Sequence, residues 1–240
     1  MEPAFTSRFQ TTSWSLVVAA GKPDTEARAA LASLCQTYWR PVYSFVRRTG
    51  YPPDEAQDLA QSFFTVLMEK NYLGDANRQR GRFRSFLLTS VKHFLANEWD
   101  RANALKRGGG QTLVSIDVME AEGWYGSSAV ELTTPERLFE RRWALAVLGR
   151  VMTRLRADFA DLGKAPLFEK MSVFLNGDPD GAHYEVLAAE LGMSSGALRV
   201  AVHRMRRKYR NILRAEIAET VSTPEEVDDE IRFLLSALSK

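Results

Sequence analysis

The chain has 240 residues, 45% hydrophobic and 26% charged, a composition typical of soluble globular proteins, and its length allows one large domain or two small ones. The net charge of +2 is too small to indicate a nucleic-acid partner by itself. Basic residues nevertheless cluster at 78–107 and 196–214, and an acidic stretch after residue 215 offsets them.

Residues 24–49 form the first predicted helix, with apolar side chains at helical spacing and an interruption at Pro41. Cys35 lies in this apolar pattern, so we expect a buried structural thiol and not a nucleophile. As the single cysteine, it excludes an intramolecular disulfide framework and suits a reducing cytoplasm. Residues 50–53 form a turn.

A second helix is predicted over 54–70, because Asp54 and Glu55 follow two prolines and suit a helix N-terminus. One side of this helix is acidic and polar, next to Phe63 and Phe64. Nothing nearby would raise the pKa of a carboxylate, so a general acid–base pair is not expected. We interpret the polar side as a docking face for a basic protein surface. A simple solvated helix face is the alternative.

The third predicted helix, 83–105, lies in a segment that interleaves basic and aromatic residues. A basic groove with aromatic rings is suited to single-stranded nucleic acid. The residues expected to approach a phosphate backbone are Arg78, Arg80, Arg82 and Arg84. Phe86 and Phe94 have core spacing, so about half of the rings are expected to pack inside. The better candidates for an exposed functional face are Lys92, Asn97, Trp99, Asp100 and Arg101.

Residues 108–134 are predicted to be an irregular linker, which begins with three glycines. A helix from 135 to about 159 follows, with Thr134 as its N-cap, and another helix is expected over 166–175. Outside the short stretch 113–118, no segment shows the alternation of a β-strand. The predicted fold is therefore all-α, with two helical domains joined by a flexible linker.

Residues 184–214 are typical of a helix-turn-helix that continues into a basic helix. Gly192 can end the first helix with a positive φ, and Ser194 or Ser195 can cap the second. The second helix has an apolar stripe, basic side chains on its other faces and no acid between 192 and 215. This pattern favours a recognition helix in a DNA major groove, with a solvated basic surface helix as the alternative.

The sequence contains no catalytic constellation. The three histidines lie in separate elements without metal-ligand spacing, and no GxGxxG, GxxxxGK or GxSxG motif occurs. We therefore predict that the chain is not an enzyme and has no catalytic residue, metal or cofactor. No run approaches the length of a membrane span and no secretory signal is evident, so we expect a cytoplasmic protein.

Three segments, in their order along the chain, resemble the extracytoplasmic-function (ECF) sigma factors of bacterial RNA polymerase. The segments are EAQDLAQSFFTVL, GRFRSFLLTSVKHFLANEWDR and LAAELGMSSGALRVAVHRMRRKYR, and the resemblance covers about 30–105 and 135–215. It implies a first domain that docks on the polymerase clamp and opens the minus-ten promoter element. It also implies a second domain that reads the minus-thirty-five element. The expected parts are an N-terminal extension (1–23), a region-2-like domain (24–107), the linker (108–134), a region-4-like helix-turn-helix domain (135–215) and an acidic extension (216–240).

The resemblance also implies roles for individual residues. Polymerase docking is expected at Asp58, Gln61, Phe63 and Phe64. Promoter reading and melting are expected at Arg82, Phe83, Phe86, Lys92, His93, Asn97, Asp100 and Arg101. The recognition helix would contact DNA through Ser195, Gly196, Arg199, Val200, His203, Arg204 and Arg207. The chain departs from the family where Phe86 replaces a usual tryptophan, His93 a usual asparagine, and Ala197-Leu198 a common Thr-Val pair.

The implied function is promoter recognition and DNA melting by a non-enzymatic polymerase subunit. Its expected partners are core RNA polymerase and promoter DNA, both duplex and single-stranded. No membrane is expected among them. The resemblance also allows an inhibitory anti-sigma protein or another regulator. The rival hypothesis is a stand-alone helix-turn-helix regulator, with 1–105 as an effector or dimerisation domain. Residues 54–101 favour the sigma factor, because an autonomous regulator needs no acidic docking helix followed by a basic aromatic one. A nucleic-acid enzyme is disfavoured by the lack of an acid–base or metal cluster.

Overall fold

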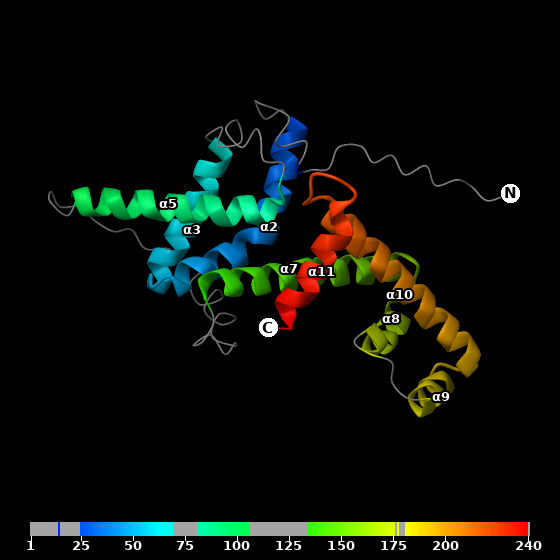
Figure 1. The fold of residues 1–240 in the computed structure, drawn as a ribbon. Helices are drawn as coiled ribbons and strands as arrows, with labels where there is room; N and C mark the ends of the chain where they lie inside the picture. The colour runs from blue at the N-terminus through cyan, green and yellow to red at the C-terminus, as the bar shows by residue number, and fades with distance from the viewer. Residues whose placement is uncertain are drawn as a thin grey trace. The chain divides into compact units, whose positions relative to one another are not determined.

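The computed structural model describes Trp14 and residues 25–69, 81–105, 134–175, 177 and 181–239. Its elements are α2 (Thr25–Arg48), α3 (Pro53–Glu69), α5 (Phe83–Leu105), α7 (Pro135–Asp161), α8 (Ala165–Met171), the 3₁₀ turn η1 (Ser172–Leu175), α9 (Gly181–Glu190), α10 (Ser195–Ala218) and α11 (Glu226–Leu238) (Figure 1). The described part contains helices and no strand, so the all-α prediction is confirmed. The predicted linker, apart from Thr134, lies outside the described residues, as does the strand-like stretch 113–118.

Local signals account for where several helices begin and end. The Thr134 Oγ1 accepts a hydrogen bond from the Arg137 backbone N–H at 3.3 Å, as predicted for the N-cap of α7. At α10 the Ser194 Oγ accepts from the Ala197 N–H at 3.2 Å, so Ser194 is the cap of the two candidates. Gly192, between α9 and α10, has a φ of +64°, a conformation that favours glycine. These helix ends follow from residues adjacent in sequence.

Helix α2 continues through Pro41, where the sequence predicted an interruption. Proline lacks the N–H for one helical hydrogen bond and its ring crowds the preceding turn, which bends a helix when packing holds both halves. Such packing is present, because Tyr38 and Val42 on either side of Pro41 are fully buried. The ribbon of α2 changes direction along its length (Figure 1). The predicted interruption is therefore a bend within one helix.

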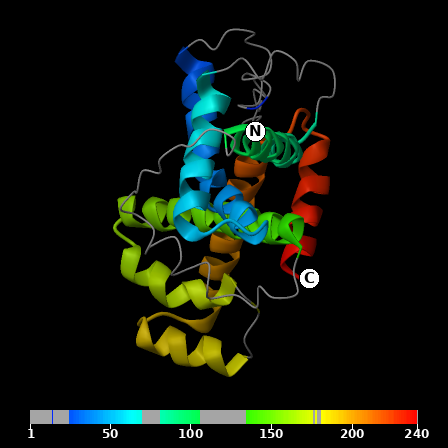
Figure 2. The ribbon, with the colours of Figure 1, turned by 90° about the vertical axis from the view of Figure 1, so that its left-hand side faces the viewer.

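The chain divides into two compact units. Unit 1 comprises residues 1–146 and 217–240, and unit 2 comprises residues 147–216. The divisions fall inside α7 and α10: unit 2 ends at 216, next to the predicted domain end at 215, and begins at 147, later than the predicted start at 135. Residues 217–240, expected as an acidic extension outside the two-domain core, belong to unit 1 and contain α11. In two views, α11 lies beside the start of α5 (Figures 1 and 2).

The core of unit 1 is built largely from aromatic side chains. The Tyr38 ring packs edge-on against Phe83, with 4.8 Å between the ring centres, and Phe139 and Trp143 of α7 are also fully buried. Cys35 is buried in α2, and this burial raises the pKa of its thiol to about 12. The predicted buried thiol is confirmed, and at neutral pH it is protonated and therefore weakly nucleophilic.

The core of unit 2 brings the apolar stripe of α10 against α7, α8 and η1. Of the predicted stripe residues, Leu198, Val202 and Met205 are buried and Tyr209 is half-buried. Leu155, Phe168 and Phe174 are buried with them. Arg206 of α10 donates hydrogen bonds to the backbone carbonyl of Phe174 at 2.8 and 3.0 Å. A further bond to the Gly177 carbonyl at 2.5 Å holds the segment that precedes α9. Part of the basic charge of α10 therefore has a structural role.

Candidate nucleic-acid interface

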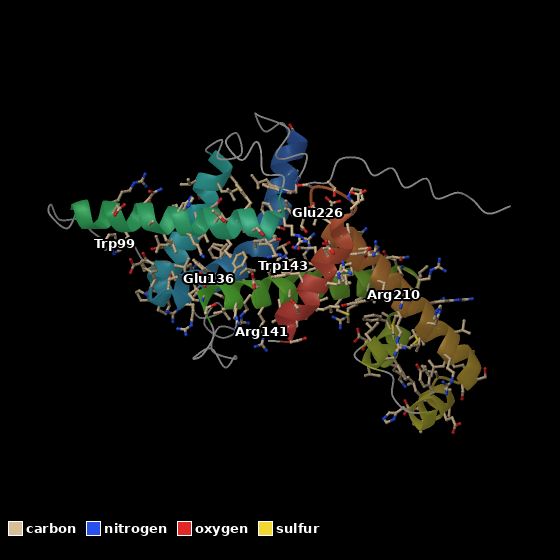
Figure 3. All side chains as sticks on the ribbon, in the orientation of Figure 1. Trp99, Glu136, Arg141, Trp143, Arg210 and Glu226 are labelled. Carbon is tan, nitrogen blue, oxygen red and sulfur yellow. The ribbon has the colours of Figure 1, made fainter. Side chains whose placement is uncertain are left out.

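Helix α5 separates buried and exposed residues along its length. Phe83, Leu87, Val91, Phe94 and Leu95 are buried. The exposed residues include Lys92, His93, Asn97, Trp99, Asp100 and Arg101. The exposure predicted for five of these six residues is confirmed, and their role stays a prediction. Trp99 is 62% exposed and lies toward the far end of α5 from α11 (Figure 3). An exposed indole provides the chemistry for stacking on a nucleobase.

The start of α5 is covered by a tryptophan from the N-terminal extension. The Trp14 ring lies 4.9 Å from Phe83 and 5.0 Å from Phe86, between ring centres. Its indole N–H donates to the Gly81 carbonyl at 2.7 Å, and its backbone N–H donates to the Glu219 carbonyl at 3.1 Å. Phe83 is fully buried and Phe86 is half-buried. These two predicted promoter-contact residues thus lie in packing contacts, apart from the exposed face of α5.

Lys92, exposed on α5, forms an ion pair with Glu136 in the first turn of α7. The Lys92 Nζ lies 2.7 Å from the Glu136 Oε1, and the two side chains are 46% and 40% exposed. The hydrogen bond from Lys92 lowers the pKa of the Glu136 carboxyl, with backbone and Thr134 hydrogen bonds acting in the same direction. A pair this exposed contributes about 0–1 kcal/mol, so Lys92 could exchange Glu136 for another anion at little cost.

Replacing Glu136 by glutamine should reduce stability only slightly at pH 7, by less than about 1 kcal/mol. Because the pKa of Glu136 is lower in the folded chain, its contribution is present above the unfolded pKa and is lost as pH falls through the folded pKa. The difference in melting temperature between parent and Glu136→Gln should therefore shrink in acid. Thermal melting followed by circular dichroism from pH 7 to about 3 checks this. A difference independent of pH would contradict an ion-pair origin.

The predicted docking residues of α3 divide between its surface and its interior. Asp58 is half-buried and Gln61 is exposed. Phe63 and Phe64 are buried, where Phe63 contacts Phe94 at 5.6 Å and Phe64 contacts Trp39 at 6.0 Å between ring centres. The aromatic pair therefore packs α3 against α5 and α2. The surface that α3 offers to a partner is polar and includes Asp54, Glu55 and Gln61.

The predicted recognition residues lie on the first turns of α10. Gly196, Arg199, Val200, His203, Arg204 and Arg207 are exposed, and Ser195 is half-buried. Arg199, His203 and Arg207 are four residues apart and therefore share one side of the helix. Lys208, on another side, pairs with Asp158 of α7 at 2.9 Å. The structure brings the predicted set together as a basic strip with one exposed valine.

A buried charge cluster at the start of α5 escaped the sequence analysis. Glu230 of α11 accepts hydrogen bonds from Arg84 at 2.7 and 3.2 Å, and its carboxylate lies 3.0 Å from the Arg82 Nε. The Arg84 guanidinium carbon also lies 3.5 Å from the centre of the Phe233 ring. Arg84 is buried, so its predicted contact with a phosphate backbone is wrong. The available signal was a single acid on the apolar stripe of an amphipathic C-terminal helix (Val227, Glu230, Leu234).

Neither a metal-binding cluster nor a membrane-spanning helix occurs in the described ranges. They contain no group of three or more histidine, cysteine, aspartate or glutamate residues that could hold a metal ion. None of their helices is both long enough and apolar enough to cross a membrane. In comparisons with known proteins, the chain matches no family, no curated protein and no solved structure. The exposed residues of α5 in unit 1 and those of α10 in unit 2 are the two candidate sites.

Proposed function

We propose that the chain is a sigma subunit of bacterial RNA polymerase that recognises promoters and holds the melted strand. The observation that carries this proposal is the stretch 92–101 of α5, which exposes two cations, an amide and a tryptophan. Lys92, Asn97, Trp99 and Arg101 have no role in the core, so their chemistry is available to a ligand. Their types match those of proteins that hold single-stranded nucleic acid.

Recognition of duplex DNA falls to α9 and α10 in this proposal. The two helices, joined through Gly192, act as a helix-turn-helix with α10 as the recognition helix. Arg199, His203 and Arg207 are exposed on one side, where they can reach base edges. Arg204 and Arg210 are exposed as well and can neutralise phosphates without reading sequence. Such a helix positions the protein on a duplex, and it has few of the rings that strand capture needs, with His203 exposed and Tyr209 half-buried.

Capture of the melted strand falls to α5. Stacking of a base on an aromatic ring contributes about 1–3 kcal/mol, and Trp99 is a large exposed ring on this helix. Lys92 and Arg101 supply positive charge. In the structure Lys92 forms an ion pair with Glu136, and Arg101 forms one with Glu98. A phosphate can replace these weakly held carboxylates. The polar surface of α3, including Asp58 and Gln61, is the proposed docking face for core polymerase.

The decisive experiment is copurification with core RNA polymerase followed by mapping of transcription start sites. On a promoter found in this way, the triple variant Lys92→Ala, Asn97→Ala, Arg101→Ala should form closed complexes normally. It should show fewer permanganate-reactive thymines near the start site, because strand capture is weakened. A template with a pre-melted bubble should restore its activity. The matched control, Gln36→Ala, Arg137→Ala, Arg141→Ala, removes the same charge from exposed positions of α2 and α7 and should open DNA like the parent.

Two results would contradict the proposal in different ways. If the Lys92, Asn97 and Arg101 variant opens linear promoter DNA as well as the parent does, α5 takes no part in strand capture. If the chain binds duplex DNA selectively but does not associate with core polymerase, it is a stand-alone regulator, the rival function that the basic face of α10 also supports.

A further inference from the structure

Arg199, which the proposed function places at the DNA, is stacked on an aromatic ring. Its guanidinium carbon lies 4.5 Å from the centre of the Tyr184 ring. Arg199 is exposed on α10, whereas Tyr184 belongs to α9 and is only 4% exposed. Both residues belong to unit 2. The contact therefore joins a flexible surface side chain to a ring that is fixed in the interior.

The Tyr184 ring is itself held firmly. Its centre lies 4.4 Å from the centre of the Phe174 ring, and Phe174 is buried. Arg206 fixes the backbone of Phe174 through two hydrogen bonds to its carbonyl. A chain of contacts thus runs from Arg206 through Phe174 and Tyr184 to Arg199. Because each neighbour restrains the next, the ring offers a rigid platform and not a mobile partner.

Stacking restrains an arginine in a way that a surface ion pair does not. An exposed pair such as Lys208 with Asp158 leaves the charge free to move within a broad range of geometries. A guanidinium over a ring keeps its plane parallel or nearly parallel to a surface while its N–H edge stays open. An open, oriented edge is what a bidentate contact to guanine O6 and N7 requires.

We propose that Tyr184 is a positioning residue that holds the Arg199 guanidinium ready to read a guanine in the major groove. This inference rests on the proposed function, since it assumes that α10 meets duplex DNA. Tyr184 itself does not touch the base and acts through Arg199. Pre-organisation lowers the conformational entropy that Arg199 loses on binding, so Tyr184 contributes to sequence discrimination and not to general affinity.

The first test needs no DNA. In the full-length chain, the NMR signal of the Arg199 Nε–H should be shifted by the ring current of Tyr184. Tyr184→Phe keeps the ring and should keep the shift, whereas Tyr184→Leu keeps an apolar side chain and should lose it. An unshifted signal in the parent, or a shift that survives in Tyr184→Leu, would overturn the proposal whatever the chain binds. If thermal melting shows that Tyr184→Leu unfolds, Tyr184→Met takes its place.

The second test measures discrimination between duplexes. A duplex selected by the parent from a random-sequence pool is compared with versions in which each guanine is replaced. Tyr184→Leu should reduce this discrimination about two- to fivefold, the factor that a cation–π contact at an exposed site represents. Tyr184→Phe should match the parent. In an Arg199→Ala background, Tyr184→Leu should cause no further loss, because the residue that it positions is gone.

The outcomes separate the inference from the function on which it rests. An equal loss for every duplex, or the same loss with and without Arg199, would make Tyr184 a packing residue and overturn the inference while DNA binding stands. A parent chain that selects no duplex from the pool would overturn duplex recognition by α10, and with it the reading role assigned to Tyr184. The NMR result would then still report whether the stacked pair exists.

Discussion

Replacing Glu230 by leucine should lower the free energy of unfolding of the chain by about 3–5 kcal/mol, the usual cost of removing one partner of a buried ion pair. Glu230 is fully buried, and its carboxylate is shared by Arg84 and Arg82. Without Glu230, the buried Arg84 guanidinium still has Glu140 nearby, with 3.8 Å between the Arg84 Nη1 and the Glu140 Oε1. Chemical denaturation followed by circular dichroism measures the loss.

Helix α11 offers a matched control for this substitution. Asp229 precedes Glu230 directly in the sequence. Unlike Glu230, it is exposed, and it forms an ion pair with Arg232 of the same helix. Asp229→Leu should therefore change stability by less than about 1 kcal/mol. The double variant Arg84→Leu, Glu230→Leu should recover much of the loss, because no buried charge is left without a partner. Equal losses for Glu230→Leu and Asp229→Leu would show that the cluster contributes nothing beyond an exposed pair.

Replacing Trp14 by alanine should also be strongly destabilising, by about 3–5 kcal/mol, because a large buried ring is removed from a packed site. Trp14 is 3% exposed and packs on Phe83 and Phe86. The substitution also removes the indole donor to the Gly81 carbonyl, which leaves that acceptor with one hydrogen bond fewer. The denaturant concentration at the midpoint of unfolding, followed by circular dichroism, should be lower than in the parent.

Trp99→Ala is the matched control and should give the opposite pair of results. Its ring is exposed, so stability should change by less than about 0.5 kcal/mol. Binding to a single-stranded oligonucleotide should weaken by about 1–3 kcal/mol if the ring stacks on a base. A large stability loss for Trp99→Ala, or none for Trp14→Ala, would contradict the contrast between the buried Trp14 ring and the exposed Trp99 ring.

The buried cluster gives the C-terminal segment a structural role in the proposed strand-binding unit. Arg82 and Arg84 lie at the start of α5, and their partner Glu230 belongs to α11. The backbone N–H of Phe83 donates to the Thr220 carbonyl at 2.9 Å, so the segment before α11 also contacts this point. The N–H groups of Ser222 and Thr223 donate to the Glu226 carboxylate and fix the turn into α11. Within unit 1, Thr220 and Glu230 therefore hold the start of α5.

The helical fold and much of the surface pattern followed from the sequence alone. Thr134 with Pro135, Ser194 and Gly192 mark helix ends, because capping and backbone conformation depend on adjacent residues. The exposure of Lys92, Asn97, Trp99, Asp100 and Arg101 was also predicted from the sequence and is confirmed, and the buried stripe of α5 ends at Leu95 among the described side chains.

Only the tertiary structure decided which charged and aromatic residues serve the interior. Arg84 and Glu230 are 146 positions apart, and no local pattern could show that they meet. Phe63 and Phe64, adjacent to the polar face of α3, were expected at a partner surface and instead pack on Phe94 and Trp39. A residue's type and spacing define which contacts it can make. Which contact it does make depends on what the rest of the chain brings within a few ångströms, and that is set by packing between distant segments.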